Sequence, residues 1–127
     1  MIVAFWCVLI AIFLPYLCTY VAKFGGGFGL RDNHDPRAFL ETLEGFARRA
    51  HSAQLNSFEI TPAFAAAVII AYISEGADLV TINVLAVLFI TSRLLYIICY
   101  LADWATLRSL VWFVSMGIVA SFFFVSI

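Results

Sequence analysis

Four long apolar runs occupy most of this chain and decide what it can fold into. They cover about residues 2–22, 55–73, 79–102 and 110–127, and the 127-residue sequence is 65% hydrophobic and only 12% charged. A helix of about 20 mostly apolar residues crosses the roughly 30 Å of hydrocarbon in a bilayer, so each run is long enough to span it once. The sequence therefore predicts an all-α membrane protein, a single domain built as a four-transmembrane-helix bundle, without room for a soluble catalytic domain.

The second run is expected to belong to a longer helix. Asp35 suits the N-cap position and Pro36 the first helical position, and no strong stop signal follows before Ile73. The part before the apolar run is amphipathic, whereas the later part is apolar on nearly every side. We therefore expect helix two to begin at about residue 36 in the cytosol and to enter the bilayer at about residue 55, with a bend at Pro62.

The positive charges are placed asymmetrically along the chain. Six of the seven Lys and Arg residues lie near span ends on one side, namely Lys23, Arg31, Arg37, Arg48, Arg49 and Arg108. By the positive-inside rule this side faces the cytosol, so both termini are expected on the non-cytosolic side. The cations form no basic run of the kind that binds nucleic acid. Short termini and the lack of targeting elements favour a multi-pass protein of a bacterial inner membrane.

Three polar residues near or within the spans are costly to bury, namely Asn56, Glu59 and Arg93. A charged side chain at a helix centre costs roughly 2.5–3.5 kcal/mol even on lenient insertion scales. Counted at about 1.5 Å per residue from the non-cytosolic ends, Glu59 and Arg93 lie at nearly the same depth, about 22 and 21 Å. The two residues can therefore pair, and such a pair alone is as consistent with helix adhesion as with a binding site.

The spans carry more polar residues than adhesion needs. Tyr96 and Tyr100 share one helix face with Arg93, at i+3 and i+7, and Arg108 lies at a depth near that of Asn56. Three helices thus offer polar side chains at matching depths, which predicts a shared pocket open to the cytosol or to a seam between subunits. Arginine and phenol groups suit a small anionic ligand, and a thiol bound among them would lose its proton more readily.

With these residues, the chain resembles the MAPEG family, the membrane-associated proteins of eicosanoid and glutathione metabolism, as a bacterial-type member. The resemblance covers roughly Asp35 to Trp112 and also fits the number of spans. One matching piece is RRAHSAQLNSFE, similar to a helix-two pattern that ends in N-x-x-E. The other is RLLYIICYLADWATLRSLVW, similar to R-x-x-H/Y-x-x-x-Y followed by a short loop and Arg-Ser. The combination, order and spacing of the pieces are more specific than either piece alone.

The resemblance implies a homotrimer of four-helix protomers that binds glutathione between neighbouring subunits near the cytosolic face. Asn56 and Glu59 would hold the peptide backbone and the amino end of glutathione. Arg93, Tyr96 and Tyr100 would hold its carboxylate and frame the peptide.

Arg108 is the catalytic residue that the resemblance implies, because it would lie beside the thiol and stabilise the thiolate. The second substrates of such proteins are lipophilic electrophiles or lipid peroxides, which enter from the bilayer. The chain is thus expected to be a membrane-bound glutathione-dependent transferase or peroxidase, with glutathione as co-substrate. Its expected partners are copies of itself, membrane lipids and hydrophobic small molecules.

The chain departs from the family pattern in the second helix. Members that use glutathione commonly have an arginine four residues before the Asn and often another directly before it, and these positions are Ser52 and Leu55 here. Arg49 lies on the same helix face, seven residues before Asn56. We therefore expect Arg49 to replace part of the missing charge and to bind the ligand together with Ser52.

The cysteines and histidines predict no metal site. Cys7, Cys18 and Cys99 fall in apolar segments without a C-x-x-C pair, and we interpret them as small packing residues. His34 lies between two aspartates of a glycine-rich loop and is expected to be solvated rather than to bind a metal ion.

Two other functions fit a four-span chain. A non-catalytic membrane module could keep the same fold and bind lipid or a partner protein. A small multidrug transporter typically uses a carboxylate in its first span, and residues 2–22 contain no acidic residue, so this alternative ranks last. Thermal stability that does not respond to glutathione would favour the non-catalytic module over the enzyme.

Overall fold

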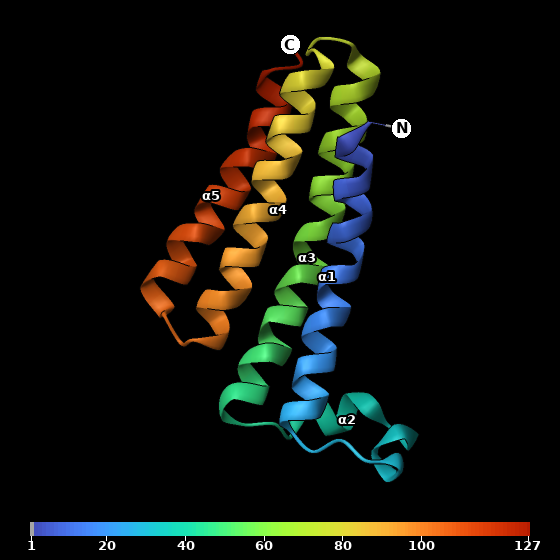
Figure 1. Cartoon of the computed structure of the whole chain (residues 1–127), viewed down its shortest axis with the longest axis vertical. Coiled ribbons are helices and arrows are strands. Elements are labelled where there is room, and N and C mark those ends of the chain that lie inside the picture. Colours follow the sequence, from blue (N-terminus) through green and yellow to red (C-terminus); the bar gives the residue numbers. More distant parts are fainter. Residues whose placement is uncertain (1) are drawn as a thin grey trace.

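The computed structural model describes residues 2–127, and all regular structure in that range is helical (Figure 1). The elements are α1 (Val3–Gly25), the 3-10 helix η1 (Leu30–His34), α2 (Pro36–Glu41), α3 (Gly45–Ser74), α4 (Leu79–Leu101) and α5 (Ala105–Phe124). Helices α1, α3, α4 and α5 are long and apolar enough to cross a membrane. The predicted all-α bundle of four transmembrane helices is confirmed.

The turns and termini divide between the two ends of the bundle. The α3–α4 turn lies at the same end as both termini, whereas η1, α2 and the α4–α5 turn lie at the opposite end (Figure 1). We call this opposite end the loop end. The six cations listed above belong to elements that begin or end there, so the charge asymmetry seen in the sequence is a property of the folded chain.

The prediction of one continuous helix over residues 36–73 is wrong, because α2 ends at Glu41 and α3 begins at Gly45. Two local features explain the break. Thr42 Oγ1 donates to the Phe39 carbonyl at 2.7 Å, which gives that carbonyl a side-chain partner in place of a further turn of helix. Gly45 has a φ of +61°, a left-handed conformation that glycine adopts at little cost.

Two aspartates act as N-caps. Asp35 Oδ1 accepts a hydrogen bond from the Ala38 N–H at 3.2 Å, as predicted, and Asp78 Oδ1 accepts one from the Thr81 N–H at 2.7 Å. The bond from Thr81 lowers the pKa of the Asp78 carboxyl from its ordinary value, because it favours the ionised form. The cap therefore stabilises α4 at neutral pH, and its contribution is lost as the pH falls through this lowered pKa.

Small residues allow α1 to pack closely against α3. Pro15 lies on the buried face of α1 and has no N–H to donate to the Ala11 carbonyl. Thr61 Oγ1 of α3 lies 3.2 Å from that carbonyl and 2.6 Å from the Ser57 carbonyl of its own helix, so its single proton is shared between the two acceptors. A backbone group that would be costly to leave unpaired in lipid thus has a hydroxyl donor within hydrogen-bond distance, and this contact joins the two helices. The other buried residues of this face include Ala4, Cys7, Cys18 and Ala22.

Asn83 of α4 binds the beginning of α1. The first backbone N–H groups of a helix have no partner within it, and Ile2, in the cap position of α1, makes no side-chain hydrogen bond. Asn83 Oδ1 accepts from the Ala4 N–H at 2.9 Å. A side chain of a neighbouring helix therefore caps α1 and fixes its position on α4.

We expect Asn83→Leu to lower the free energy of unfolding by about 1–3 kcal/mol, because it leaves the Ala4 N–H without its acceptor. Thermal unfolding in detergent, followed by circular dichroism, measures the change. Thr91→Val is the matched control, since Thr91 is exposed on the same helix and bonds to the Val87 carbonyl of that helix. Equal losses in the two variants would contradict the cap.

Aromatic and hydroxyl contacts hold α4 between α3 and α5. Phe64 of α3 stacks on Phe89 of α4 with ring centroids 3.9 Å apart, and Phe122 of α5 meets Phe64 edge-on at 6.0 Å. Ser92 Oγ of α4 lies 2.8 Å from Ser115 Oγ of α5. These contacts fix the rotation of α4, and with it the direction of the residue that follows Ser92.

Candidate functional site

Arg93 lies in the interior of the bundle, with 2% of its surface exposed. Its Nη2 donates to Asn56 Oδ1 of α3 at 2.6 Å, a short distance that fits a charge-assisted hydrogen bond. Its guanidinium carbon lies 4.1 Å from the centre of the Tyr96 ring, within reach of a cation–π contact. The structure thus brings together three of the residues that the sequence placed in one pocket.

The contacts continue from Tyr96 to α5. The rings of Tyr96 and Tyr100 meet edge-on with centroids 5.7 Å apart, and the guanidinium carbon of Arg108 lies 4.4 Å from the centre of the Tyr100 ring. Arg108 belongs to the helix because α5 begins at Ala105, earlier than the apolar run. We call this set of contacting residues the polar stripe: Asn56, Arg93, Tyr96, Tyr100 and Arg108.

Glu59 does not contact Arg93, so the pair that their equal depth allowed is not formed. Arg93 Nη2 bonds to Asn56, and Nη1 has no hydrogen-bond partner within residues 2–127. The reason is the rotation of α3, whose buried face includes Ala53 and Ile60. Asn56 lies at the edge of that face, whereas Glu59 is turned about 60° further outward, at about 100° per residue, and is exposed.

Arg93 Nη1 is a buried donor that the described residues leave unpaired. A guanidinium taken out of water is strongly destabilising unless other groups compensate its charge. Asn56 is neutral and supplies one acceptor oxygen. The polar stripe therefore has more positive charge and donor capacity than its own residues satisfy, which is the property expected of an anion site.

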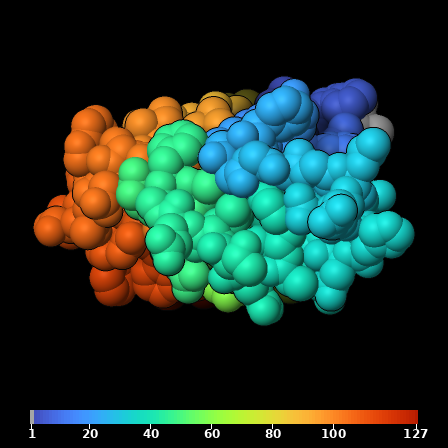
Figure 2. All heavy atoms as spheres, turned by 90° about the horizontal axis from the view of Figure 1, so that it is seen from below, coloured from blue at the N-terminus to red at the C-terminus, as the bar shows by residue number. Residues whose placement is uncertain are grey.

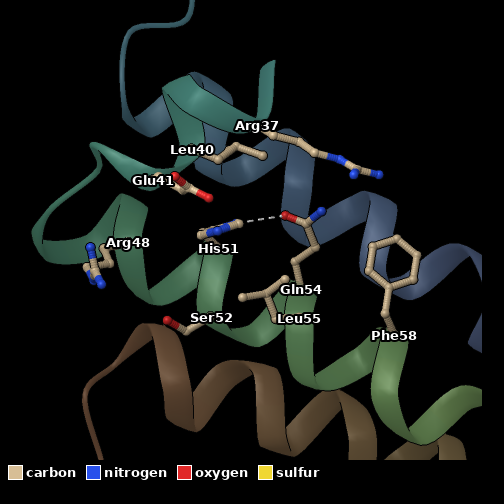
Figure 3. Close-up of a pocket in the computed structure, with 9 residues that line it drawn as sticks. All are labelled: Arg37, Leu40, Glu41, Arg48, His51, Ser52, Gln54, Leu55 and Phe58. Atoms are coloured by element: carbon tan, nitrogen blue, oxygen red, sulfur yellow. Dashed lines mark hydrogen bonds between the residues drawn. The ribbon is translucent and has the colours of Figure 1, made fainter. Parts of the chain in front are cut away.

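Arg49 and Ser52, the other two predicted ligand-binding residues, lie outside the polar stripe. Arg49 Nε and Nη2 both donate to the Leu101 carbonyl at 3.3 Å, and this contact satisfies the C-terminal end of α4. Ser52 lines a separate cleft between α2 and α3, together with Arg48 and His51 (Figure 3). In this chain, Arg49 makes a structural contact with the end of α4, and Ser52 faces the separate cleft between α2 and α3.

A small cavity lies at the Arg108 end of the polar stripe. It measures about 190 Å³ and is lined by Tyr96, Arg108, Ser109, Trp112 and Phe113. Pockets that enclose drug-sized ligands measure roughly 300–1,000 Å³, so this cavity can hold only one end of such a ligand. Phe113 was missed in the sequence because it is one of many apolar residues in its run.

Neither the cysteines nor the other possible metal ligands form a cluster. Within residues 2–127, no three His, Cys, Asp or Glu side chains are grouped so that they could hold a metal ion. The three cysteines are free and buried, which confirms their interpretation as packing residues.

The arrangement can bind and ionise an acidic group at its open end. Arg108 is partly exposed and faces a cavity with apolar walls, and in a low dielectric a guanidinium favours the ionised form of an acid beside it. Arg93, in contrast, is buried, donates a hydrogen bond to Asn56 and lies over the Tyr96 ring. The polar stripe thus combines one charge that a ligand can reach with a second that orients its neighbours.

One comparison with known proteins gives a match over nearly the whole chain. The family model described as the MAPEG family matches residues 3–127, essentially the whole chain. No curated protein and no solved structure matches the chain. The family match extends beyond the two sequence pieces around Asn56 and Arg93 and includes α1 and the end of α5.

Proposed function

Because the chain belongs to the MAPEG family, we propose that it is a glutathione-dependent enzyme that transfers glutathione to lipophilic electrophiles or reduces lipid peroxides. It is a multi-pass integral membrane protein with four helices suited to span the bilayer. The observation that carries the proposal is the polar stripe, which leads from a buried guanidinium to Arg108 at an apolar cavity.

Arg108 would act on the thiol of glutathione. Its charge would lower the pKa of the thiol, and the resulting thiolate is the nucleophile. In transfer, the thiol proton passes to water, the sulfur forms a bond to the electrophilic carbon, and the leaving group departs with its electron pair. Trp112 and Phe113 would form the apolar wall against which an electrophile from the bilayer lies.

Arg93 would act as a positioning residue. Its hydrogen bond fixes Asn56 Oδ1 toward the interior, so the amide nitrogen of Asn56 is left to donate to the peptide backbone of glutathione. Tyr96 and Tyr100 would frame the peptide in the same way. Glu59, exposed one turn beyond Asn56, would bind the amino end of glutathione.

A homotrimer would complete this site. The cavity at Arg108 is too small for a tripeptide, and Glu59 is open on the surface of α3, so a further wall from another protomer is required. Arg49 and Ser52 would contact the ligand only if it lay between two protomers. We also propose that the loop end faces the cytosol of a bacterial inner membrane, with both termini on the other side.

Glutathione titration of the purified protein tests the proposal. Glutathione at 100 times its dissociation constant should stabilise the folded protein by about 2.7 kcal/mol, and an ultraviolet difference spectrum should show a thiolate band. S-methylglutathione is the matched control ligand, because it should stabilise the protein without giving the band. If neither ligand changes the thermal unfolding and no standard electrophile is conjugated, the enzymatic proposal fails.

The alternative is a non-catalytic module with the family fold that binds lipid or a partner protein. The observation that favours it is the absence of arginine at Ser52 and Leu55, combined with the structural contact made by Arg49. The same glutathione titration distinguishes this module from the enzyme. With the module, glutathione should neither stabilise the folded protein nor give a thiolate band.

A further inference from the structure

A second cleft lies outside the polar stripe, between α2 and the first turns of α3 (Figure 3). It measures about 500 Å³, which is within the usual range for ligand pockets. Seen from the loop end, the beginning of α3 lies between the α4–α5 turn and the segment of η1 and α2 (Figure 2). The cleft and the cavity at Arg108 therefore belong to different parts of this surface.

The rim of the cleft is basic. Arg37 of α2 and Arg48 of α3 lie on opposite sides of His51 in the view of Figure 3, and both arginines are exposed. Glu41 is the one carboxylate of the lining. The two arginines and this carboxylate give the lining a net charge of +1. The rim thus favours an anion.

The other end of the cleft is apolar and continues along the membrane span. Leu55 and Phe58 line it, and the Phe58 ring meets Tyr16 of α1 edge-on at 5.4 Å. At about 1.5 Å per residue from Ser74, Phe58 and Leu55 lie at about 24 and 29 Å, within the roughly 30 Å of hydrocarbon. His51 lies at about 35 Å by the same count, which is the depth of lipid headgroups.

We propose that the cleft between α2 and α3 binds an anionic phospholipid, with its headgroup at the basic rim to which Arg37 and Arg48 contribute and an acyl chain along Leu55 and Phe58. Arginine binds phosphate bidentately, and a positively charged lining attracts an anionic headgroup more strongly than a zwitterionic one. A soluble anion would use the rim and leave the apolar end unused. A bound lipid would link α2 to α3 across the break at residues 42–44.

Native mass spectrometry tests the proposal on the full chain. The protein is released from nanodiscs that contain equal amounts of phosphatidylglycerol and phosphatidylcholine, and the wild type should retain phosphatidylglycerol. The retention should fall about fivefold for Arg37→Gln or Arg48→Gln and roughly thirtyfold for the double variant. Arg31→Gln is the matched control, because Arg31 is an exposed cation at the same end and lies outside the cleft.

Three outcomes would overturn the proposal. The first is a lack of specificity. It would appear either as equal retention of the two lipids by the wild type or as a loss of retention in Arg31→Gln equal to that in the cleft variants. The second is displacement of the lipid by glycerol phosphate at millimolar concentration, which would assign the rim to a soluble anion. The third is that the wild type retains no lipid while the double variant changes its oligomeric state, which would assign the cleft to a subunit contact. Unfolding temperatures of the single variants separate lost binding from lost folding.

Discussion

Replacing Arg108 with alanine is expected to lower kcat/KM for glutathione transfer by about 10²–10³-fold, the usual effect of removing one group that stabilises charge at a reacting atom. The fold should persist, because Arg108 is partly exposed and its contacts are the Tyr100 ring and the cavity. No buried partner is left unsatisfied by the change. Steady-state kinetics with a standard electrophile, together with the unfolding temperature, measure the two effects separately.

The pH dependence of transfer distinguishes a charge effect from a packing effect. If Arg108 lowers the pKa of the bound thiol, the rate of Arg108→Ala should keep rising with pH up to about 8.5, near the pKa of a free thiol. Arg108→Lys keeps the charge and should recover part of the rate at neutral pH. Arg31→Ala, at the same end of the bundle, should leave both the rate and the profile unchanged. Identical pH profiles in the wild type and Arg108→Ala would contradict the role assigned to Arg108.

The number of spanning helices could be predicted because it depends on local composition. Each apolar run is long enough to satisfy its backbone within one helix in lipid, whatever its neighbours do. The break between α2 and α3 could not be predicted in this way. It depends on the hydrogen bond of the Thr42 hydroxyl and on the left-handed conformation of Gly45, which give no signal in a pattern of apolar residues.

The polar stripe could be predicted in part, because residue counts along a helix give depth and helical spacing gives the shared face. Depth placed Glu59 level with Arg93, but the rotation of α3 placed Asn56 beside Arg93 instead. That rotation is set by packing between helices, for example the stacking of Phe64 on Phe89. A side chain one turn away on the same helix is therefore easily mistaken for the true partner.

The hydrogen bonds between helices could not be predicted from the sequence. Pro15 indicates that the Ala11 carbonyl lacks its usual donor, but only the structure identifies Thr61 as the replacement. In the same way, nothing in the sequence links Asn83 to the start of α1, 79 residues away. Such contacts require that the arrangement of the helices be known first.

The second large effect is expected at Arg93, where stability and binding should change in opposite directions. Arg93→Met combined with Asn56→Leu should raise the free energy of unfolding by about 1–4 kcal/mol, as when a buried polar pair is replaced by apolar residues of similar size. The reason is that Arg93 is 2% exposed and its Nη1 has no partner within residues 2–127. The same variant should lose the stabilisation by glutathione, which thermal unfolding with and without the ligand would measure.

The alternative role of Arg93 is adhesion between α3 and α4, and it predicts the opposite sign. If the hydrogen bond to Asn56 mainly held the helices together, the same double variant would instead lower the free energy of unfolding by about 1.5–3 kcal/mol, the usual contribution of a hydrogen bond to a charged group. Arg93→Lys is the matched control, because it keeps the charge without the planar fork and should bring neither the gain in stability nor full binding. If the double variant is more stable than the wild type, Arg93 is not needed for folding. We would then infer that the chain keeps this charge to bind a ligand, because destabilising polar groups persist mainly where function requires them.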